Sequence, residues 1–172
     1  RFAARVPWVL NIAKRRGEAA AGYRALLKKF DDQYDKEDVR DVLRDARLSL
    51  SAIAVIDNDL PQAEEWLEQV LDEFPDDVGA KNDLGYLWAD QNKRLERSLR
   101  MIETAIAAEP DNQAYLDSHG WILYRLGRYQ EALAAQLKAV EPRDSREIDG
   151  VVLDHLADIY TALNQHQAAL EV

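Results

Sequence analysis

Small residues recur about every 35 positions along this sequence, inside runs of apolar residues. Three series follow this period, with 34 to 37 residues between neighbouring members, and Pro75 and Pro110 lie 35 residues apart. Such self-similarity is typical of repeat arrays, in which each unit buries its apolar face against its neighbours. The period therefore predicts a stretch of stacked units rather than one closed globule. The series are Ser51, Gly85, Gly120 and Ala157; Ala63, Ser98, Ala132 and Ala169; and Val70, Ala105 and Ala139.

Each unit contains two apolar runs with the spacing of a helix face. In the clearest unit, 77–90 and 97–108 both show this spacing, so two consecutive helices are expected there. Pro75 and Pro110 cannot continue the helices before them, because proline lacks an amide donor and clashes with the preceding turn. Turn residues separate the helices, and aspartates stand where N-terminal caps are wanted. The turns are Asn58-Asp59, Gln91-Asn92, Gly127 and Asn164, and the expected caps are Asp76, Asp111 and Asp144.

The small residues suggest how the two helices of a unit meet. Helices can cross closely only where a side chain is nearly absent. Gly85 on a first helix is therefore expected to face Ser98 on the second, and Gly120 is expected to face Ala132 in the next unit. A bulky replacement such as Gly85→Leu should overpack the contact, at a cost of about 1–3 kcal/mol.

Composition and charge remove several classes of function. The 172 residues include no cysteine, which excludes disulfides, zinc–cysteine sites and thiol nucleophiles. No window reaches the ~18 apolar residues of a membrane helix, so no direct membrane insertion is expected. The net charge of −10 argues against a nucleic-acid partner. Residues 1–30 carry a net charge of +7, and the remainder carries −17. This segment can be a basic arm for an acidic partner, or an end that docks on the rest of the chain. The favoured interpretation is a solvated helix face that happens to be basic.

Catalytic and metal-binding patterns are missing from the sequence. His119, His155 and His166 never pair at helical spacing with another histidine, so each is interpreted as a packing or surface residue. Asp117, Ser118 and His119 have the residue types of a catalytic triad, but neighbours on one helix point in different directions. No glycine-rich phosphate loop occurs. We therefore expect a non-catalytic chain with no cofactor and no metal.

The stretch 116–133, LDSHGWILYRLGRYQEAL, places a glycine in one helix, a Gly-x-Tyr turn and small residues in the next helix. It resembles a tetratricopeptide repeat (TPR), and the resemblance covers about 44–172, most weakly over 44–77. The other matching residues are Leu84-Gly85, Trp88, Ala105 and Pro110; Gly127, Tyr129, Ala132 and Ala139; Leu156-Ala157, Tyr160 and Ala169; and Ser51, Leu60, Ala63, Leu67 and Pro75.

The resemblance implies an all-α fold, a right-handed α-solenoid of antiparallel helix pairs. We expect a degenerate helical pair over 1–36, broken at Gly17, followed by TPR-like repeats over 37–172. The expected repeats are about 44–77, 78–112, 113–149 and a truncated 150–172.

Three features depart from the family pattern. The turn 91–96 holds one extra residue, and the connection 141–150 is about three residues too long. Gln136 stands where a large apolar residue is usual. In addition, the last helix is cut at Val172, which should leave Leu170 exposed.

In such a solenoid the first helix of each pair lines the concave face. The resemblance therefore implies a partner-binding groove that is rich in aspartate and carries aromatic anchors. We expect a protein or peptide partner with basic and apolar residues. The chaperone-clamp subclass of TPRs is disfavoured, because carboxylates replace the cations that would hold a C-terminal carboxylate. The alternative is that the aromatic residues only pack between repeats. The groove residues are Asn82, Tyr86, Asp90, Asp117, Trp121, Tyr124, Arg125, Asp154 and Asp158.

Other functions stay open at this point. The chain can be an auxiliary region of a larger enzyme, an envelope adaptor that serves a protease, or a self-assembly module that forms a homo-oligomer. Because the sequence starts at Arg1, we expect a fragment or a processed chain. The compartment is undecided between the bacterial cytoplasm and the periplasm or cell envelope.

Overall fold

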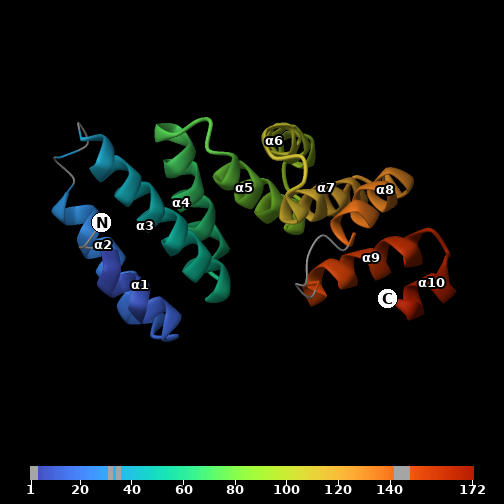
Figure 1. The fold of residues 1–172 in the computed structure, drawn as a ribbon, viewed down its shortest axis with the longest axis horizontal. Coiled ribbons are helices and arrows are strands. Elements are labelled where there is room, and N and C mark those ends of the chain that lie inside the picture. Colours follow the sequence, from blue (N-terminus) through green and yellow to red (C-terminus); the bar gives the residue numbers. More distant parts are fainter. Residues whose placement is uncertain (1–3, 31–32, 34–35, 142–147) are drawn as a thin grey trace. The chain divides into compact units, whose positions relative to one another are not determined.

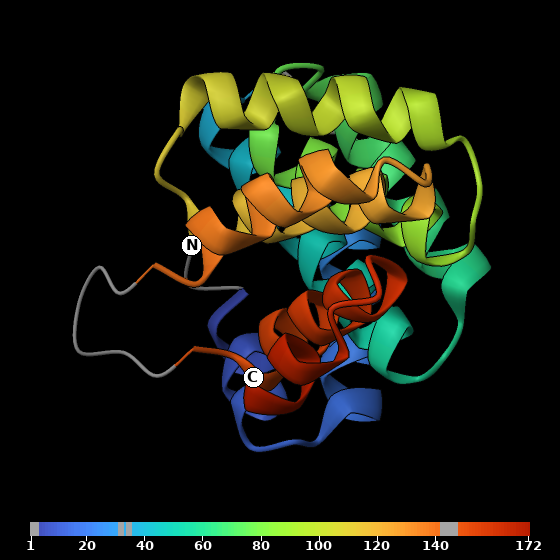
Figure 2. The ribbon, with the colours of Figure 1, turned by 90° about the vertical axis from the view of Figure 1, so that its right-hand side faces the viewer.

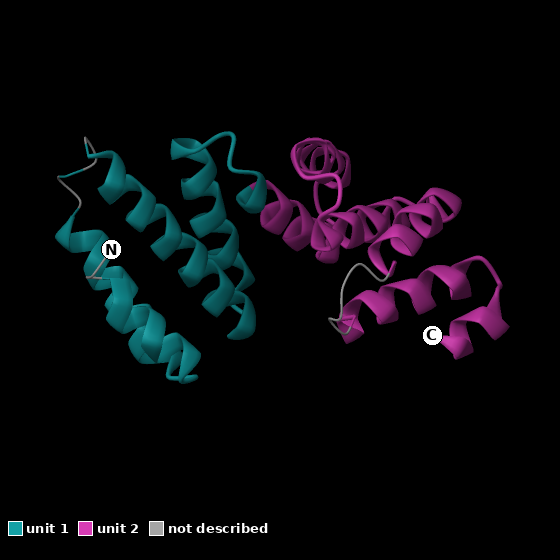
Figure 3. Cartoon of the chain, viewed as in Figure 1, with its two compact units in different colours: residues 1–80 teal, residues 81–172 magenta. Residues whose placement is uncertain are grey.

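The structure, a computed structural model, describes residues 4–30, 33, 36–141 and 148–172. Across these ranges the secondary structure consists of ten helices and no strand. The chain divides into two compact units, residues 1–80 and 81–172, which Figure 3 colours separately. None of the helices in the described ranges is long and apolar enough to cross a membrane.

Unit 1 contains two helix hairpins, visible in Figure 1. α1 (Arg5–Ile12) packs against α2 (Arg16–Lys29), and α3 (Glu37–Ile56) packs against α4 (Leu60–Glu73). The hairpins meet where α2 contacts α3. Their shared core is apolar, so it stabilises the unit through the burial of hydrocarbon surface. Its buried residues are Ala19, Ala20, Tyr23, Leu26, Ala46, Leu50 and Ile53.

Unit 2 continues with three more helix pairs, and α5 (Val78–Asp90) begins just before its boundary. Within unit 2, α7 packs against α6 and α8, while α9 contacts α7, α8 and α10. Figure 2 shows α9 and α10, in red, as an antiparallel hairpin. The remaining helices are α6 (Leu95–Ala108), α7 (Gln113–Arg125), α8 (Tyr129–Ala139), α9 (Gly150–Ala162) and α10 (His166–Glu171).

The turns inside the helix pairs lie where the sequence predicted them, with one exception. Four turn residues adopt the left-handed backbone conformation that ends a helix and reverses the chain. In the first pair this conformation falls on Lys14, at φ 59°, and Gly17 lies in the first turn of α2. The expected break at Gly17 is therefore wrong. The four correctly predicted residues are Asn58, Asn92, Gly127 and Asn164.

The helix caps at the starts of α5 and α7 lie one residue later in the sequence than predicted. Asp77 accepts a hydrogen bond of 2.8 Å from the backbone N–H three residues on, in the first turn of α5. Asn112 accepts one of 3.1 Å at the start of α7. A cap must directly precede the first helical residue, so Asp76 and Asp111 are too early to serve. The expected cap Asp144 lies outside the described residues.

The predicted contacts between small residues are present. A β-carbon added to Gly85 would meet the backbone oxygen of Ser98 at 3.4 Å, and one added to Gly120 would meet the backbone oxygen of Ala132 at the same distance. In unit 1 the hydroxyl of Ser51 donates a hydrogen bond of 3.1 Å to the carbonyl oxygen of Ala63. The 35-residue series therefore marks the crossing points of successive helix pairs.

The extra residue in the turn between α5 and α6 is absorbed by the backbone. Asn92 and Arg94 both take left-handed conformations, with φ of 56° and 46°. The Arg94 guanidinium then lies 4.7 Å from the ring centre of Trp88, and Arg97 lies 4.9 Å from it. Trp88 itself is fully buried.

Candidate protein-binding surface on α5, α7 and α9

A row of stacked rings joins the first helices of three successive pairs. His155 on α9 stacks on Trp121 of α7, with ring centres 4.2 Å apart and planes 15° from parallel. Trp121 also stacks on Tyr124, one turn further along α7, at 5.0 Å and 16°. On its other side His155 contacts Tyr86 of α5 at 6.0 Å between ring centres. The row ends at Tyr129, 5.6 Å from Tyr124. Such ring pairs prefer particular orientations, and they stabilise a fold beyond the contribution of the apolar area that they bury.

A buried hydrogen-bond network lies beside these rings. Asp117 on α7 accepts from His155 Nδ1 at 3.0 Å and from the side-chain amide of Gln136 on α8 at 2.5 Å, both on its Oδ1 atom. The same Gln136 nitrogen donates to the carbonyl oxygen of Val152 on α9 at 2.9 Å. In the neutral tautomer that donates from Nδ1, Nε2 of His155 is an acceptor, and the Tyr86 hydroxyl lies 3.5 Å from it. One carboxylate thereby links three helices.

Helical spacing explains why α7 carries both parts of the site. Asp117, Trp121 and Tyr124 follow one another at intervals of four and three, so they share one face of the helix. His155 lies 38 residues after Asp117, close to one repeat period, on the next first helix. The repeat geometry therefore brings the two residues together, and α7 contacts α9 directly.

Burial separates the nine predicted groove residues into three groups. Asn82, Asp117 and Trp121 are each at most 8% exposed and belong to the interior of unit 2. Tyr86, Tyr124 and Arg125 are half-buried. The remaining three are the carboxylates Asp90, Asp154 and Asp158, which are exposed.

Arg125 is held in place by its neighbours on α5 and α7. Its guanidinium donates 2.9 Å to the backbone oxygen of Asp90 and lies 3.9 Å from a carboxylate oxygen of the same residue. It also lies 5.4 Å from the ring centre of Trp121. The charge of Asp90 is thus partly compensated within the chain, whereas the structure gives Asp154 and Asp158 no ion pair among the described residues.

Two tyrosines of the row, Tyr86 and Tyr124, have raised pKa values. Burial, reinforced by the carboxylates of Asp90 and Asp117, raises the pKa of Tyr86 to about 12. The pKa of Tyr124 is also raised, first by burial and then by the charge of Asp158. Both hydroxyls stay protonated near neutral pH and can donate hydrogen bonds.

Sequence reasoning missed two members of this arrangement. His155 was interpreted as a packing or surface residue and is indeed buried, but its bond to Asp117 was not foreseen. Gln136 was noted only as a departure from the family pattern. The available signal was that departure itself, since a fully buried amide needs polar partners.

Across the described ranges no group of three or more histidine, aspartate or glutamate side chains could hold a metal ion. Asp117 and His155 are two ligands at most, and both are used in the network described above.

Comparison with known sequences gives two matches. Residues 89–147 match a model of the tetratricopeptide-repeat family. A TPR repeat-containing protein of Pseudomonas aeruginosa is 37% identical to this chain over 98 residues, which are 57% of the chain. The match covers 17% of the length of that relative.

Solved structures with the same fold include two of MamA. The MamA structure of strain AMB-1 has a TM-score of 0.70 at 22% identity and covers 99% of this chain and 93% of its own. MamA of Desulfovibrio magneticus RS-1 has a TM-score of 0.61 at 17% identity, covering 88% and 89%. A Podosopora anserina protein with nearly identical TPR-like repeats reaches 0.71 at 16% identity, covering 99% and 90%.

At these identities the structural likeness shows the fold alone. The fold class predicted from the sequence, an all-α solenoid of antiparallel TPR-like helix pairs, is confirmed. The family match and the Pseudomonas relative agree with it. The fold is therefore that of tetratricopeptide-repeat proteins, and residues 89–147 match the model of that family.

Proposed function

We propose that this chain is a non-catalytic protein-interaction scaffold whose α5, α7 and α9 bind a segment of a partner protein. The fold is one that serves protein–protein interaction, and the finer assignment rests on the surface described above. The single observation that carries it is the combination of a preformed aromatic row with exposed carboxylates on the same three helices.

The chemistry of the surface specifies the partner segment. Tyr124 is half-buried and its hydroxyl stays protonated, so it offers a ring face and a hydrogen-bond donor. Asp154 and Asp158 on α9 add two exposed negative charges, and neither forms an ion pair within the described ranges. Apolar or aromatic side chains of the partner would pack on the ring, and lysine or arginine would pair with the carboxylates.

The buried residues have a supporting part. Trp121 and His155 hold Tyr124 and Tyr86 in a fixed arrangement, which lowers the entropy lost on binding. Replacing Trp121 would therefore damage the fold of unit 2 together with any binding. A test of binding should change exposed residues instead.

The experiment is a selection of peptides from a random displayed library, performed on the wild-type chain. We expect selected sequences that combine lysine or arginine with apolar residues. Binding of these peptides should be lost in the double variant Asp154→Lys/Asp158→Lys and weakened in Tyr124→Ala.

Glu103→Lys provides a control, because it replaces an exposed carboxylate by lysine, as the double variant does at two positions, but on α6, a second helix. That variant should bind the selected peptides like the wild type. Selection of acidic peptides, or equal losses in the α9 and α6 variants, would refute the proposed surface.

A further inference from the structure

Arg125 shows how this fold holds an arginine side chain. Its guanidinium lies 5.4 Å from the ring centre of Trp121, on the same helix α7. It also donates a hydrogen bond of 2.9 Å to the backbone oxygen of Asp90 on α5, whose carboxylate lies 3.9 Å away. Arginine suits such a place because its planar, charged group stacks on a ring while its N–H groups bond to oxygen atoms. A cation of the chain thus closes the junction between α5 and α7.

The next junction, between α7 and α9, has no such arginine. Arg125 comes five residues after Gly120, and the residue at the same place in the following repeat is Ala162, five residues after Ala157. Across the described ranges, no cation stacks on Tyr124 and Asp158 forms no ion pair. This junction therefore keeps an unpaired carboxylate near an aromatic ring.

Helical spacing places Asp158 beside Tyr124. His155 of α9 stacks on Trp121 of α7. Asp158 comes three residues after His155 and lies one turn further along α9, and Tyr124 lies one turn further along α7 than Trp121. Because first helices of antiparallel pairs run in the same direction, these two further residues also approach each other. In agreement, the pKa of Tyr124 is raised first by burial and next by the negative charge of Asp158.

Tyr129 supplies the open ring of this junction. It is the first residue of α8, directly after the turn that follows α7, and it is 38% exposed. Its ring centre lies 5.6 Å from that of Tyr124, with the planes tilted by 48°. Trp121 covers one face of Tyr124, so a planar cation would stack on Tyr129 and meet Tyr124 beside it. The adjacent Arg128 is held by Glu131 instead, through hydrogen bonds of 2.8 and 2.5 Å.

We propose that Tyr129, Tyr124 and Asp158 form a subsite that binds an arginine side chain of the partner protein in preference to lysine. The inference rests on the proposed function, because it assigns one residue type of the partner to one part of that surface. The guanidinium stacks on the Tyr129 ring and pairs with the Asp158 carboxylate. A lysine ammonium pairs with the carboxylate as a point charge, but it has no planar face for the ring and no pair of parallel donors.

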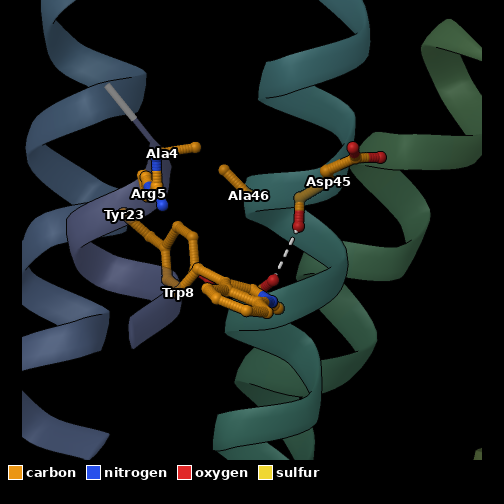
Figure 4. A pocket seen from close by; sticks show the side chains of 7 residues that line it. Ala4, Arg5, Trp8, Tyr23, Asp45 and Ala46 are labelled. Atoms are coloured by element: carbon orange, nitrogen blue, oxygen red, sulfur yellow. Dashed lines mark hydrogen bonds between the residues drawn. The ribbon is translucent and has the colours of Figure 1, made fainter. Parts of the chain in front are cut away.

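A second group of aromatic residues, in unit 1, provides a contrast. Figure 4 shows a pocket of about 380 Å³ between α1, α2 and α3, with Trp8 and Tyr23 in its lining. Its one carboxylate, Asp45, is already paired with Arg44 at 3.0 Å, and the lining already contains the cation of Arg5. Removing a ring from this pocket should therefore leave the recognition of arginine unchanged.

The experiment uses two displayed peptide libraries, which are selected on the wild-type 172-residue chain. Arginine is the only basic residue type in one library, and lysine is the only one in the other. We expect binding peptides from the arginine library. Calorimetry then compares a selected peptide with the same peptide in which lysine replaces arginine, and the lysine peptide should bind about threefold to tenfold more weakly.

Three variants of the chain locate the subsite. Tyr129→Leu keeps an apolar side chain but removes the ring, so the difference in affinity between the arginine and lysine peptides should nearly vanish. Asp158→Asn should weaken the binding of both peptides, because both lose a charge partner. Trp8→Leu is the matched control and should keep the full difference, because it removes a ring that is 56% exposed in unit 1. Circular dichroism checks that each variant is folded.

The outcomes separate this inference from the proposed function. If both libraries yield peptides whose binding is lost in Asp154→Lys/Asp158→Lys, and arginine and lysine peptides bind equally well, the arginine subsite is refuted while the proposed function stands. If Tyr129→Leu keeps the preference for arginine, or if Trp8→Leu abolishes it, the assignment to Tyr129 is wrong. If neither library yields a peptide whose binding depends on Asp154 and Asp158, the proposed function fails and this inference fails with it.

Discussion

His155 Nδ1 lies 3.0 Å from Asp117 Oδ1, although the two residues are 38 positions apart, on first helices of successive pairs. Both residues are less than 8% exposed. The bond therefore acts in a medium where an unpaired polar group is costly. It links α9 to α7, and Gln136 extends the link to α8.

Replacement of Asp117 by asparagine should lower the stability of unit 2. The change keeps the volume but removes the charge that strengthens both bonds to Oδ1, so we expect a loss of about 1–2 kcal/mol in the free energy of unfolding. Urea denaturation measures it. The exposed Asp158→Asn is the control, expected within about 0.5 kcal/mol of the wild type. Equal losses in the two variants would mean that the network contributes nothing.

Gly120 and Gly85 should differ in their tolerance of alanine. A β-carbon at Gly120 would collide with Gln136 Oε1, whereas one at Gly85 would reach only ordinary contact with Ser98. We expect Gly120→Ala to cost about 1–3 kcal/mol and Gly85→Ala clearly less.

The collision can be separated from other effects by a double variant. Gln136→Ala removes the atom that Gly120→Ala would strike, so the two changes together should cost less than the sum of their separate costs. If the losses in the free energy of unfolding, measured by urea denaturation, were strictly additive, the collision with Gln136 would not be the reason for the cost of Gly120→Ala.

The features that follow from local rules could be predicted from the sequence. The repeat period predicted the helix pairs. The residues Asn58, Asn92, Gly127 and Asn164 predicted their turns, because asparagine and glycine favour the left-handed backbone conformation and can be recognised individually in a sequence. The caps were displaced by one residue, since Asp76 and Asp77 are equivalent as residue types and only the start of α5 distinguishes them.

The candidate site was less predictable. Asp117 was placed on an open groove from its repeat position, and nothing local indicates that it would be buried under His155 and Gln136. That outcome depends on how α7 and α9 stack, which involves residues 38 positions apart. Asp158, by contrast, is exposed as a groove residue should be. The position of a residue in the repeat therefore predicts its helix and the approximate face of that helix. Whether the side chain is buried can be determined only from the packing of the helices.

The stability of the chain should depend on pH through His119. Burial lowers the pKa of this histidine from its ordinary value of 6.5. Glu103 and Glu131 oppose that shift, while Arg128 and Lys138 support it. A lowered pKa in the folded state means that stability is fully present above about 6.5 and is lost as pH falls through the folded value.

The measurement is the free energy of unfolding as a function of pH in matched histidine variants. His119→Asn should show a smaller loss of stability on acidification than the wild type. The exposed His166→Asn is the control and should follow the wild type. If His166→Asn flattened the profile and His119→Asn did not, the assignment to His119 would be wrong.

An ion pair between α3 and α4 should stabilise unit 1. Arg47, which is 8% exposed in its side chain, lies 3.1 Å from Glu73 and donates to Gln69 at 3.3 Å. Glu73→Gln weakens this pair, so we expect a loss of about 1–2 kcal/mol in urea denaturation. Asp72→Asn, an exposed neighbour on α4, should cost little. A larger loss for Asp72→Asn than for Glu73→Gln would contradict the role of the pair.

The most direct test of the proposed function is to locate, on the isotopically labelled chain, the binding site of a selected peptide that carries basic and apolar residues. Amide chemical shifts measured during a titration give this location residue by residue. We expect the largest changes at Tyr86, Tyr124, Asp154 and Asp158, on α5, α7 and α9, and small changes on α6 and α8. Changes confined to α6 and α8 would contradict a binding surface on the first helices.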